Sequence, residues 1–433
     1  MCMQKFIKSS LDYIEQNLKT DITAEELAKM ANYSVWHYYR LFNETTGSSV
    51  ANYIVKRRLD HALAEISLGR KAIDVVLEYG FDTYAGFYKA FVKMYGCSPR
   101  KYLSIYKNHT PKTEVLLMAN IYNEKDLRKI LENWDIPQNL KIEDVSEYDW
   151  KRWKVGDYYL TTNERDKMIR NIKIAKALNK QGLSSMFLPI PIKSGGDYLD
   201  GENIFILAQK KGEPYHSDGS TIMTREKLLN YGIKTGQGVA KLHKAFKSVQ
   251  DDVKPDDVNI YKLVMEWAMP ETKKYIQKYN MNISEEFFDD YIKNFSVIYP
   301  KLPKQFIHRN PHGGNILFEN GEVTSIIGFE YYNEYNVRIF DVLYAAGELN
   351  TKPLEYELSN TIDEYLTVLK GILKGYDSVN PLTEEEKQSI FYVSFSTAMI
   401  FIAYLDETQE VAKRNREALI LLLENKEKFY NLI

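Results

Sequence analysis

The side chains best able to do chemistry gather in two short stretches of the chain, 306–318 and 326–330. The first stretch carries two imidazoles and two amides, at His308, Asn310, His312 and Asn315. The second supplies one carboxylate, Glu330, two residues after Gly328. Two histidines without paired carboxylates do not make a metal site, and one amide is a poor ligand for Mg²⁺. The two stretches therefore offer hydrogen bonds and one negative charge, and no metal site is predicted.

The surrounding hydrophobic pattern predicts strands followed by helices as the scaffold for these stretches. Three segments read as strands: 158–162, 187–192 and 203–207. Residues 164–182 have a helical period that ends at a glycine. From Thr224 to the end the pattern is mainly helical, apart from the two stretches and a hairpin at 317–327. We therefore expect a small lobe containing a sheet and a larger helical lobe.

Several strings within residues 140–425 resemble the aminoglycoside phosphotransferase and choline kinase-like superfamily. The most specific string is 308–318, and weaker matches lie at 182–183, 189–191, 236–243 and 338–344. The resemblance implies an α+β bilobal protein-kinase-like domain, which we place at 140–433. It also implies small hydroxylated or aminated ligands, such as aminoglycosides, choline or sugars.

The resemblance further implies where the groups for phosphoryl transfer belong. The reaction needs a carboxylate as base, a second carboxylate for Mg²⁺, and a lysine oriented by a glutamate on a helix. By resemblance these positions are Asn310, Gly328, Thr161 and Asn171, and none of them carries a charge. We therefore expect no catalytic residue, no cofactor and no enzymatic activity. The alternative is that Glu330 does the work of the missing acids.

The cleft between the lobes is then expected to bind a small molecule rather than to transform it. Its candidate residues are His308, Asn310, Asn315, Gly328 and Glu330. We expect His308 to orient its loop through a hydrogen bond with the backbone.

The first part of the chain contains an internal repeat with an offset of 49 residues. Residues 38–42 recur as 87–91 with matching aromatic and basic positions, and a Gly-x-Ser follows each copy. Thr23 and Glu26 predict a capping box for the helix before the first copy, and Gly80 predicts the end of the helix before the second. The buried stripes of these two helices are predicted at Leu27, Ala28 and Ala31, and at Ile73, Val76 and Leu77. The pattern predicts two helix-turn-helix units.

Residues 4–106 resemble the AraC/XylS family of bacterial transcription regulators, most specifically at 80–82, 87–91 and 96–102. The resemblance implies an all-α double helix-turn-helix domain, which we place at 1–107. Its recognition helices would enter successive major grooves of double-stranded DNA about 34 Å apart. The residues predicted to contact DNA are Trp36, His37, Arg40, Arg57, Tyr84, Tyr88 and Lys89. Of these, Arg57 is expected to contact phosphate or to be a surface charge rather than to contact bases.

Length and composition agree with a multidomain protein. A chain of 433 residues is expected to form two or three domains, and we interpret 108–139 as a linker with a short helix. Residues 1–107 carry a net charge of +4 in a chain of −2, which suits phosphate contact at one end. Two cysteines and the lack of an apolar run of about 18 residues favour a cytoplasmic protein without a membrane partner.

These patterns together predict a DNA-binding transcriptional regulator. Its C-terminal domain is expected to be catalytically inactive and to sense an unknown small molecule. Ligand binding would change DNA binding or contact with RNA polymerase. Two alternatives stay open: an active kinase of the aminoglycoside or choline type fused to a DNA-binding domain, and a purely structural second domain.

Overall fold

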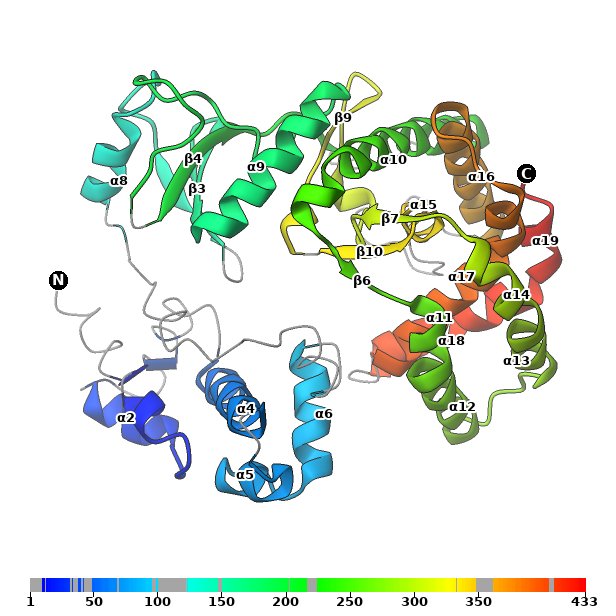
Figure 1. Cartoon of the computed structure of the whole chain (residues 1–433), viewed down its shortest axis with the longest axis horizontal. Helices are drawn as coiled ribbons and strands as arrows, with labels where there is room; N and C mark the ends of the chain where they lie inside the picture. Colours follow the sequence, from blue (N-terminus) through cyan, green and yellow to red (C-terminus); the bar gives the residue numbers. More distant parts are fainter. Residues whose placement is uncertain are drawn as a thin grey trace. The chain divides into compact units, whose positions relative to one another are not determined.

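The computed structural model divides into two compact units, residues 1–129 and 130–433, each with its own hydrophobic core (Figure 1). The structure describes residues 10–11, 13–31, 33, 38–39, 42, 49–67, 70–95, 99, 122, 124–146, 150–201, 203–215, 224–331, 333–347, 361–404 and 409–433. The predicted fold class is confirmed: an all-α helix-turn-helix unit precedes an α+β kinase-like unit.

The described helices of the first unit are α2 (Ala24–Met30), α4 (Val50–Ser67), α5 (Ala72–Glu78) and α6 (Tyr84–Tyr95). The predicted capping box is present, because Thr23 accepts the N–H of Glu26 and the Glu26 carboxylate accepts the N–H of Thr23. Gly80 has a φ of 77°, the left-handed conformation that ends a helix. Thr83 then begins α6 by accepting the N–H of Gly86. The local signals for these helix ends were therefore read correctly.

The buried face of α5 differs from the prediction. Val76 is buried as expected, but Ile73 and Leu77 are exposed, at 37% and 50%. Val75 and Tyr79 take their places in the core. The helix has only seven residues, so its own hydrophobic period does not fix which face turns inward.

The second unit begins with a four-stranded antiparallel sheet in the order β1-β2-β3-β4. Its strands are β1 (Ile142–Asp144), β2 (Lys151–Val155), β3 (Tyr158–Asn163) and β4 (Ile204–Gln209). Helix α9 (Arg165–Lys180) follows β3 directly and buries one face (Figure 1). The strand predicted at 187–192 is not formed. Pro189 and Pro191 lack the N–H groups that a sheet ladder requires.

Two three-stranded sheets carry the loops of interest. The first pairs β5 (Glu213–Pro214), β8 (Ile316–Glu319) and β9 (Glu322–Ile326) in that order. The second pairs β6 (Asp256–Asp257), β10 (Glu334–Val337) and β7 (Lys304–Ile307) in that order. The predicted hairpin at 317–327 corresponds to β8 and β9.

The rest of the second unit is helical. Its longer helices are α10 (Arg225–Val253), α12 (Met269–Lys278), α16 (Ile362–Val379), α17 (Glu384–Tyr404) and α18 (Gln409–Glu424). The shorter ones are α11 (Ile260–Leu263), α13 (Glu286–Asp290), α14 (Ser296–Ile298), α15 (Ile339–Tyr344) and α19 (Lys426–Tyr430). Single π or 3₁₀ turns lie at Val264–Ala268, Tyr291–Phe295, Tyr299–Lys301, Gly313–Asn315 and Phe329–Tyr331. None of the helices in the described parts of the chain has the length and hydropathy to cross a membrane.

Helices α10 and α16 approach closely because both carry pairs of glycines at a spacing of four. A Cβ on Gly236 would lie 2.0 Å from the carbonyl oxygen of Ile372, and a Cβ on Gly375 would lie 2.0 Å from that of Ile233. Only glycine permits backbones at this distance. Helix α10 also packs against β7 and β9, the strands next to the two stretches.

The segment predicted as linker contains α8 (Glu124–Leu131), and its end packs with the second unit. Trp134 is fully buried and donates to the carbonyl of Ile190. The Lys193 N–H donates to the carbonyl of Asn133. The predicted boundaries at 107 and 140 remain predictions, with residues from 130 onward contributing to the second core.

Candidate ligand cleft and nucleic-acid interface

Asp341 holds the loop that contains the two histidines. Its buried carboxylate accepts the N–H of His308 at 2.6 Å and that of Arg309 at 2.8 Å. The imidazole of His243 lies 3.0 Å from the same carboxylate. Arg309 has a φ of 76°, which is unfavourable for a residue with a side chain, so these bonds fix a strained backbone. Asp341 lies within the predicted family match at 338–344, but its positioning role was not predicted from the sequence.

His308 makes the predicted hydrogen bond with the backbone, and this bond connects residues 306–318 to residues 326–330. Its Nε2 lies 2.8 Å from the carbonyl of Ile327 and donates to it. Its Nδ1 accepts the N–H of Asn310 at 3.2 Å. Burial lowers the pKa of His308, which keeps the imidazole neutral and able to do both. Burial and the neighbouring His308 also lower the pKa of His312.

Asn315 occupies the space beside Gly328. Its amide donates to the carbonyl of Asn310 at 2.9 Å. Gly328 has a φ of 86°, and a Cβ there would lie 2.7 Å from the Asn315 Nδ2. The structure therefore brings together Asn310, Asn315 and Gly328, and their role in lining a ligand pocket stays a prediction. An acidic side chain at position 328 would require Asn315 to move.

Glu330 is buried and faces a cation that the sequence did not reveal. Its Oε1 accepts from Nη2 of Arg152 at 3.3 Å, whereas its Oε2 has no hydrogen-bond partner. Arg152 lies on β2 opposite Thr161 on β3, and its Nε donates to the Thr161 hydroxyl. Its guanidinium also lies 5.4 Å from the ring centre of Phe187. A buried positive charge therefore lies beside Glu330.

Asn171 lies close to this pair, on α9. It is fully buried, its Oδ1 accepts from Arg170, and its Nδ2 has no partner. Arg170 in turn donates to the backbone carbonyl of Glu330 at 3.0 Å. Thr161, at the position expected for the lysine, therefore contacts Arg152, which pairs with Glu330. Asn171, at the position expected for the helix partner, contacts Arg170, which donates to the Glu330 backbone.

In the first unit, α6 presents a polar and aromatic face to solvent. Tyr84 and Tyr88 are each 38% exposed, and Ala85 and Lys89 are exposed beside them. On the opposite face Phe87 and Phe91 are fully buried. This division matches the prediction for a recognition helix. The predicted contacts Trp36, His37 and Arg40 lie outside the described residues.

The prediction for Arg57 needs correction. Its side chain is only 3% exposed in the core of the first unit. Two of its nitrogens donate to the Glu15 carboxylate at 2.5 and 2.8 Å, and a third lies 3.2 Å from Asp60. Arg57 is thus a buried structural cation that is not available to a DNA phosphate.

Two family models match this arrangement. Residues 27–105 match a helix-turn-helix domain, and residues 143–377 match the phosphotransferase enzyme family over more than half of the chain. The chain belongs to the phosphotransferase enzyme family. It also carries an AraC-type helix-turn-helix domain at its N-terminal side.

Two relatives of this phosphotransferase-family protein each match about a quarter of its length. It is 33% identical over 115 residues to the uncharacterized HTH-type transcriptional regulator YbfP of Bacillus subtilis (strain 168), covering 26% of this chain and 39% of the relative. It is 36% identical over 97 residues to the transposon Tn10 TetD protein of Escherichia coli, covering 22% and 70%. The solved amicoumacin kinase hAmiN gives a TM-score of 0.46 at 14% identity, covering 73% and 95%.

Family membership corrects the prediction that the chain is not an enzyme. The match to the phosphotransferase enzyme family spans both stretches and points to a phosphotransferase. The prediction counted charges at four fixed positions, among them Thr161 and Asn310. It did not foresee that Arg152 brings a positive charge to the same place from the neighbouring strand.

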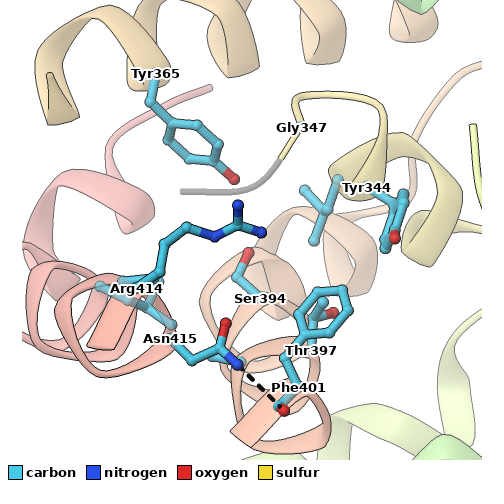
Figure 2. Close-up of a pocket in the computed structure, with 12 residues that line it drawn as sticks. Tyr344, Gly347, Tyr365, Ser394, Thr397, Phe401, Arg414 and Asn415 are labelled. Atoms are coloured by element: carbon cyan, nitrogen blue, oxygen red, sulfur yellow. Dashed lines mark hydrogen bonds between the residues drawn. The ribbon is translucent and has the colours of Figure 1, made fainter. Parts of the chain in front are cut away.

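The second unit of this phosphotransferase-family protein has a further hollow of about 70 Å³ between α15, α16, α17 and α18. Leu343, Phe401 and other apolar side chains line part of it. Figure 2 shows the Arg414 guanidinium between the hydroxyl groups of Tyr365 and Ser394. The Ser394 hydroxyl is buried without a hydrogen-bond partner. A small molecule with an apolar body and polar groups matches this lining.

Proposed function

We propose that this chain is a DNA-binding regulator of transcription whose phosphotransferase-family unit binds a small molecule. Binding of the small molecule changes the affinity for DNA or the contact with RNA polymerase. The observation that carries the proposal is that one chain joins an AraC-type helix-turn-helix domain to a phosphotransferase-family unit. A ligand that prefers one arrangement of the second unit shifts the population of the whole protein.

The exposed face of α6 supports the DNA-binding part. Tyr84, Tyr88 and Lys89 are free of the core, and the helix has the length that fits a major groove. We expect Lys89 to contact a base edge or a phosphate. The relative YbfP is named an HTH-type transcriptional regulator, which agrees with this part of the proposal.

The test begins with selection of bound duplexes from a random DNA pool by the full chain. Affinity for the selected DNA is then measured for Lys89→Ala and for Lys71→Ala, a matched control at an exposed site outside α6. We expect Lys89→Ala to weaken binding by about tenfold or more and Lys71→Ala to have little effect. Equal affinities of the two variants would argue against α6 as the reading helix.

The small-molecule part is tested by thermal unfolding with panels of aminoglycosides, amino alcohols and sugars. A ligand that binds only the folded unit stabilises it by an amount that rises with the logarithm of the ligand concentration above its Kd. Each stabilising compound is then added to the DNA-binding assay. Compounds that stabilise the protein but leave DNA affinity unchanged would contradict the regulatory link.

A second candidate function is phosphoryl transfer to that small molecule. The family match favours it, and so does Glu330, a buried carboxylate with one unpartnered oxygen beside Arg152. In this case the Glu330 carboxylate does the work of the acids that are missing at Asn310 and Gly328. Release of phosphate or labelling of the ligand with Mg²⁺-ATP tests it, and Glu330→Gln should reduce the rate by about a hundredfold or more.

A further inference from the structure

The ion pair between Arg152 and Glu330 is incomplete. One guanidinium nitrogen meets one carboxylate oxygen at 3.3 Å, although arginine and a carboxylate can make two parallel bonds. The second oxygen of Glu330 is buried without a donor. Nη1 of Arg152 has no hydrogen-bond partner among the described residues. Buried polar groups that lack partners usually meet a ligand or water.

The position of Arg152 indicates what that ligand is. Antiparallel pairing sets residue 152 directly opposite residue 161, so the two side chains share one face of the sheet about 5 Å apart. Resemblance to kinases assigns the phosphate-binding lysine to position 161, which is Thr161 here. The Arg152 Nε lies 3.2 Å from the Thr161 hydroxyl. The guanidinium therefore occupies the neighbourhood that the lysine would fill.

We propose that Arg152 is the phosphate-binding cation of this cleft, moved by one strand, and that Glu330 is its counter-ion until a phosphate chain binds. This proposal rests on the proposed function, since it names the chemistry of a ligand for the same unit. The ligand class is a di- or triphosphate, either of a nucleoside or inorganic.

The unpartnered donors around the pair suit such a ligand. Phosphate oxygens accept from the spare donors of Arg152 in the planar geometry that guanidinium favours. The unpartnered Nδ2 of Asn171 is a further donor on the adjacent helix. Arg170 connects this helix to Glu330, because it donates to the Asn171 Oδ1 and to the backbone carbonyl of Glu330. No covalent step is involved, because the exchange is one anion for another at the guanidinium.

Calorimetric titration of the full chain with inorganic tripolyphosphate, ADP and adenosine tests the proposal. We expect the protein to bind a phosphate compound and Arg152→Thr to weaken that binding about tenfold to a hundredfold. Adenosine binding should not change. ADP binding without tripolyphosphate binding identifies a nucleotide site, and binding of both identifies a site for the phosphate chain itself.

A swap variant separates phosphate binding from a role in folding. In Arg152→Thr combined with Thr161→Lys, the cation returns to the opposite residue of the strand pair, into space that the arginine vacates. We expect this double variant to recover most of the lost phosphate affinity. Glu330→Gln removes the competing anion and should raise tripolyphosphate affinity a few-fold.

Three outcomes would overturn the proposal. They are no binding of any phosphate compound, equal phosphate affinity in Arg152→Thr, and no recovery in a folded swap variant. Thermal unfolding of the second unit shows that each variant is folded. If phosphate binding fails these tests while DNA binding and its regulation by a ligand are observed, only the role of Arg152 is rejected. If DNA binding and its regulation are not observed, the proposed function is rejected.

Discussion

His308 ties stability to pH because it is buried and neutral. Burial lowers its pKa below the ordinary value of 6.5, so the folded chain holds its proton less tightly than the unfolded chain. Stability is therefore fully present above about pH 6.5 and falls as pH drops below it, when the unfolded chain takes up the proton. A protonated Nδ1 also cannot accept the N–H of Asn310.

We expect the unfolding temperature to be clearly lower at about pH 5.5 than at about pH 7.5. His308→Gln should be less stable at pH 7.5 but should show a smaller change between the two values. Thermal unfolding followed by circular dichroism measures both. An equally large pH effect in the variant would assign the titration to other groups, such as His312.

Gly328 is required both by its backbone and by its neighbour. Its φ of 86° disfavours any side chain, and a Cβ would collide with Asn315. Gly321 provides a matched control, since its φ is 79° and nothing lies within 4 Å of a Cβ there. We expect Gly321→Ala to cost about 1 kcal/mol for the backbone alone and Gly328→Ala about 2–4 kcal/mol. Denaturant unfolding measures both, and equal costs would mean that Asn315 moves freely.

At the scale of elements, local signals could be predicted from the sequence and pairings across the fold could not. The capping box at Thr23 and the turn at Gly80 depend on residues a few positions apart, so their types suffice. The inward face of α5 depends on what packs against it, and Ile73 and Leu77 were placed wrongly.

The charge of the cleft could not be predicted for the same reason. The family resemblance correctly brought His308, Asn310, Asn315 and Gly328 together, because they lie in two adjacent loops. Arg152 reaches the cleft only through the register of β2 on β3, and its partner Glu330 is 178 residues away. Arg57 likewise finds Glu15 across 42 residues. A sequence read in one dimension shows such residues only as isolated charges.

The contact between α10 and α16 gives a prediction at this scale. A Cβ on Gly236 meets backbone at 2.0 Å, whereas one on Gly238 in the same helix meets only the side chain of Val323 at 2.9 Å. Both changes gain helix propensity of about 1 kcal/mol. We expect Gly236→Ala to destabilise the second unit by about 3 kcal/mol or more, and Gly238→Ala by much less. Similar unfolding midpoints for the two variants would contradict a backbone contact between the helices.

At the scale of the whole molecule, the two units have separate cores. They serve one function only if binding of a ligand to one unit changes the binding affinity of the other. Leu27, Phe42 and Phe87 belong to one core, and Phe246, Phe306 and Tyr376 to the other. A change in one core therefore need not alter the other. Regulation must come from a free energy of coupling, which acts equally in both directions.

This reciprocity yields the prediction that links all three scales. If saturating ADP changes the affinity for the selected DNA by some factor, that DNA must change the affinity for ADP by the same factor. We expect a factor of about 5 to 150, the usual range for allosteric coupling. Arg152→Thr should bring the factor close to one at attainable ADP concentrations while leaving DNA affinity without ADP unchanged. Fluorescence anisotropy of labelled DNA and calorimetry of ADP measure the two sides. ADP binding without any change in DNA affinity would show that the nucleotide is not the signal, and the search would turn to ligands of the hollow beside Arg414.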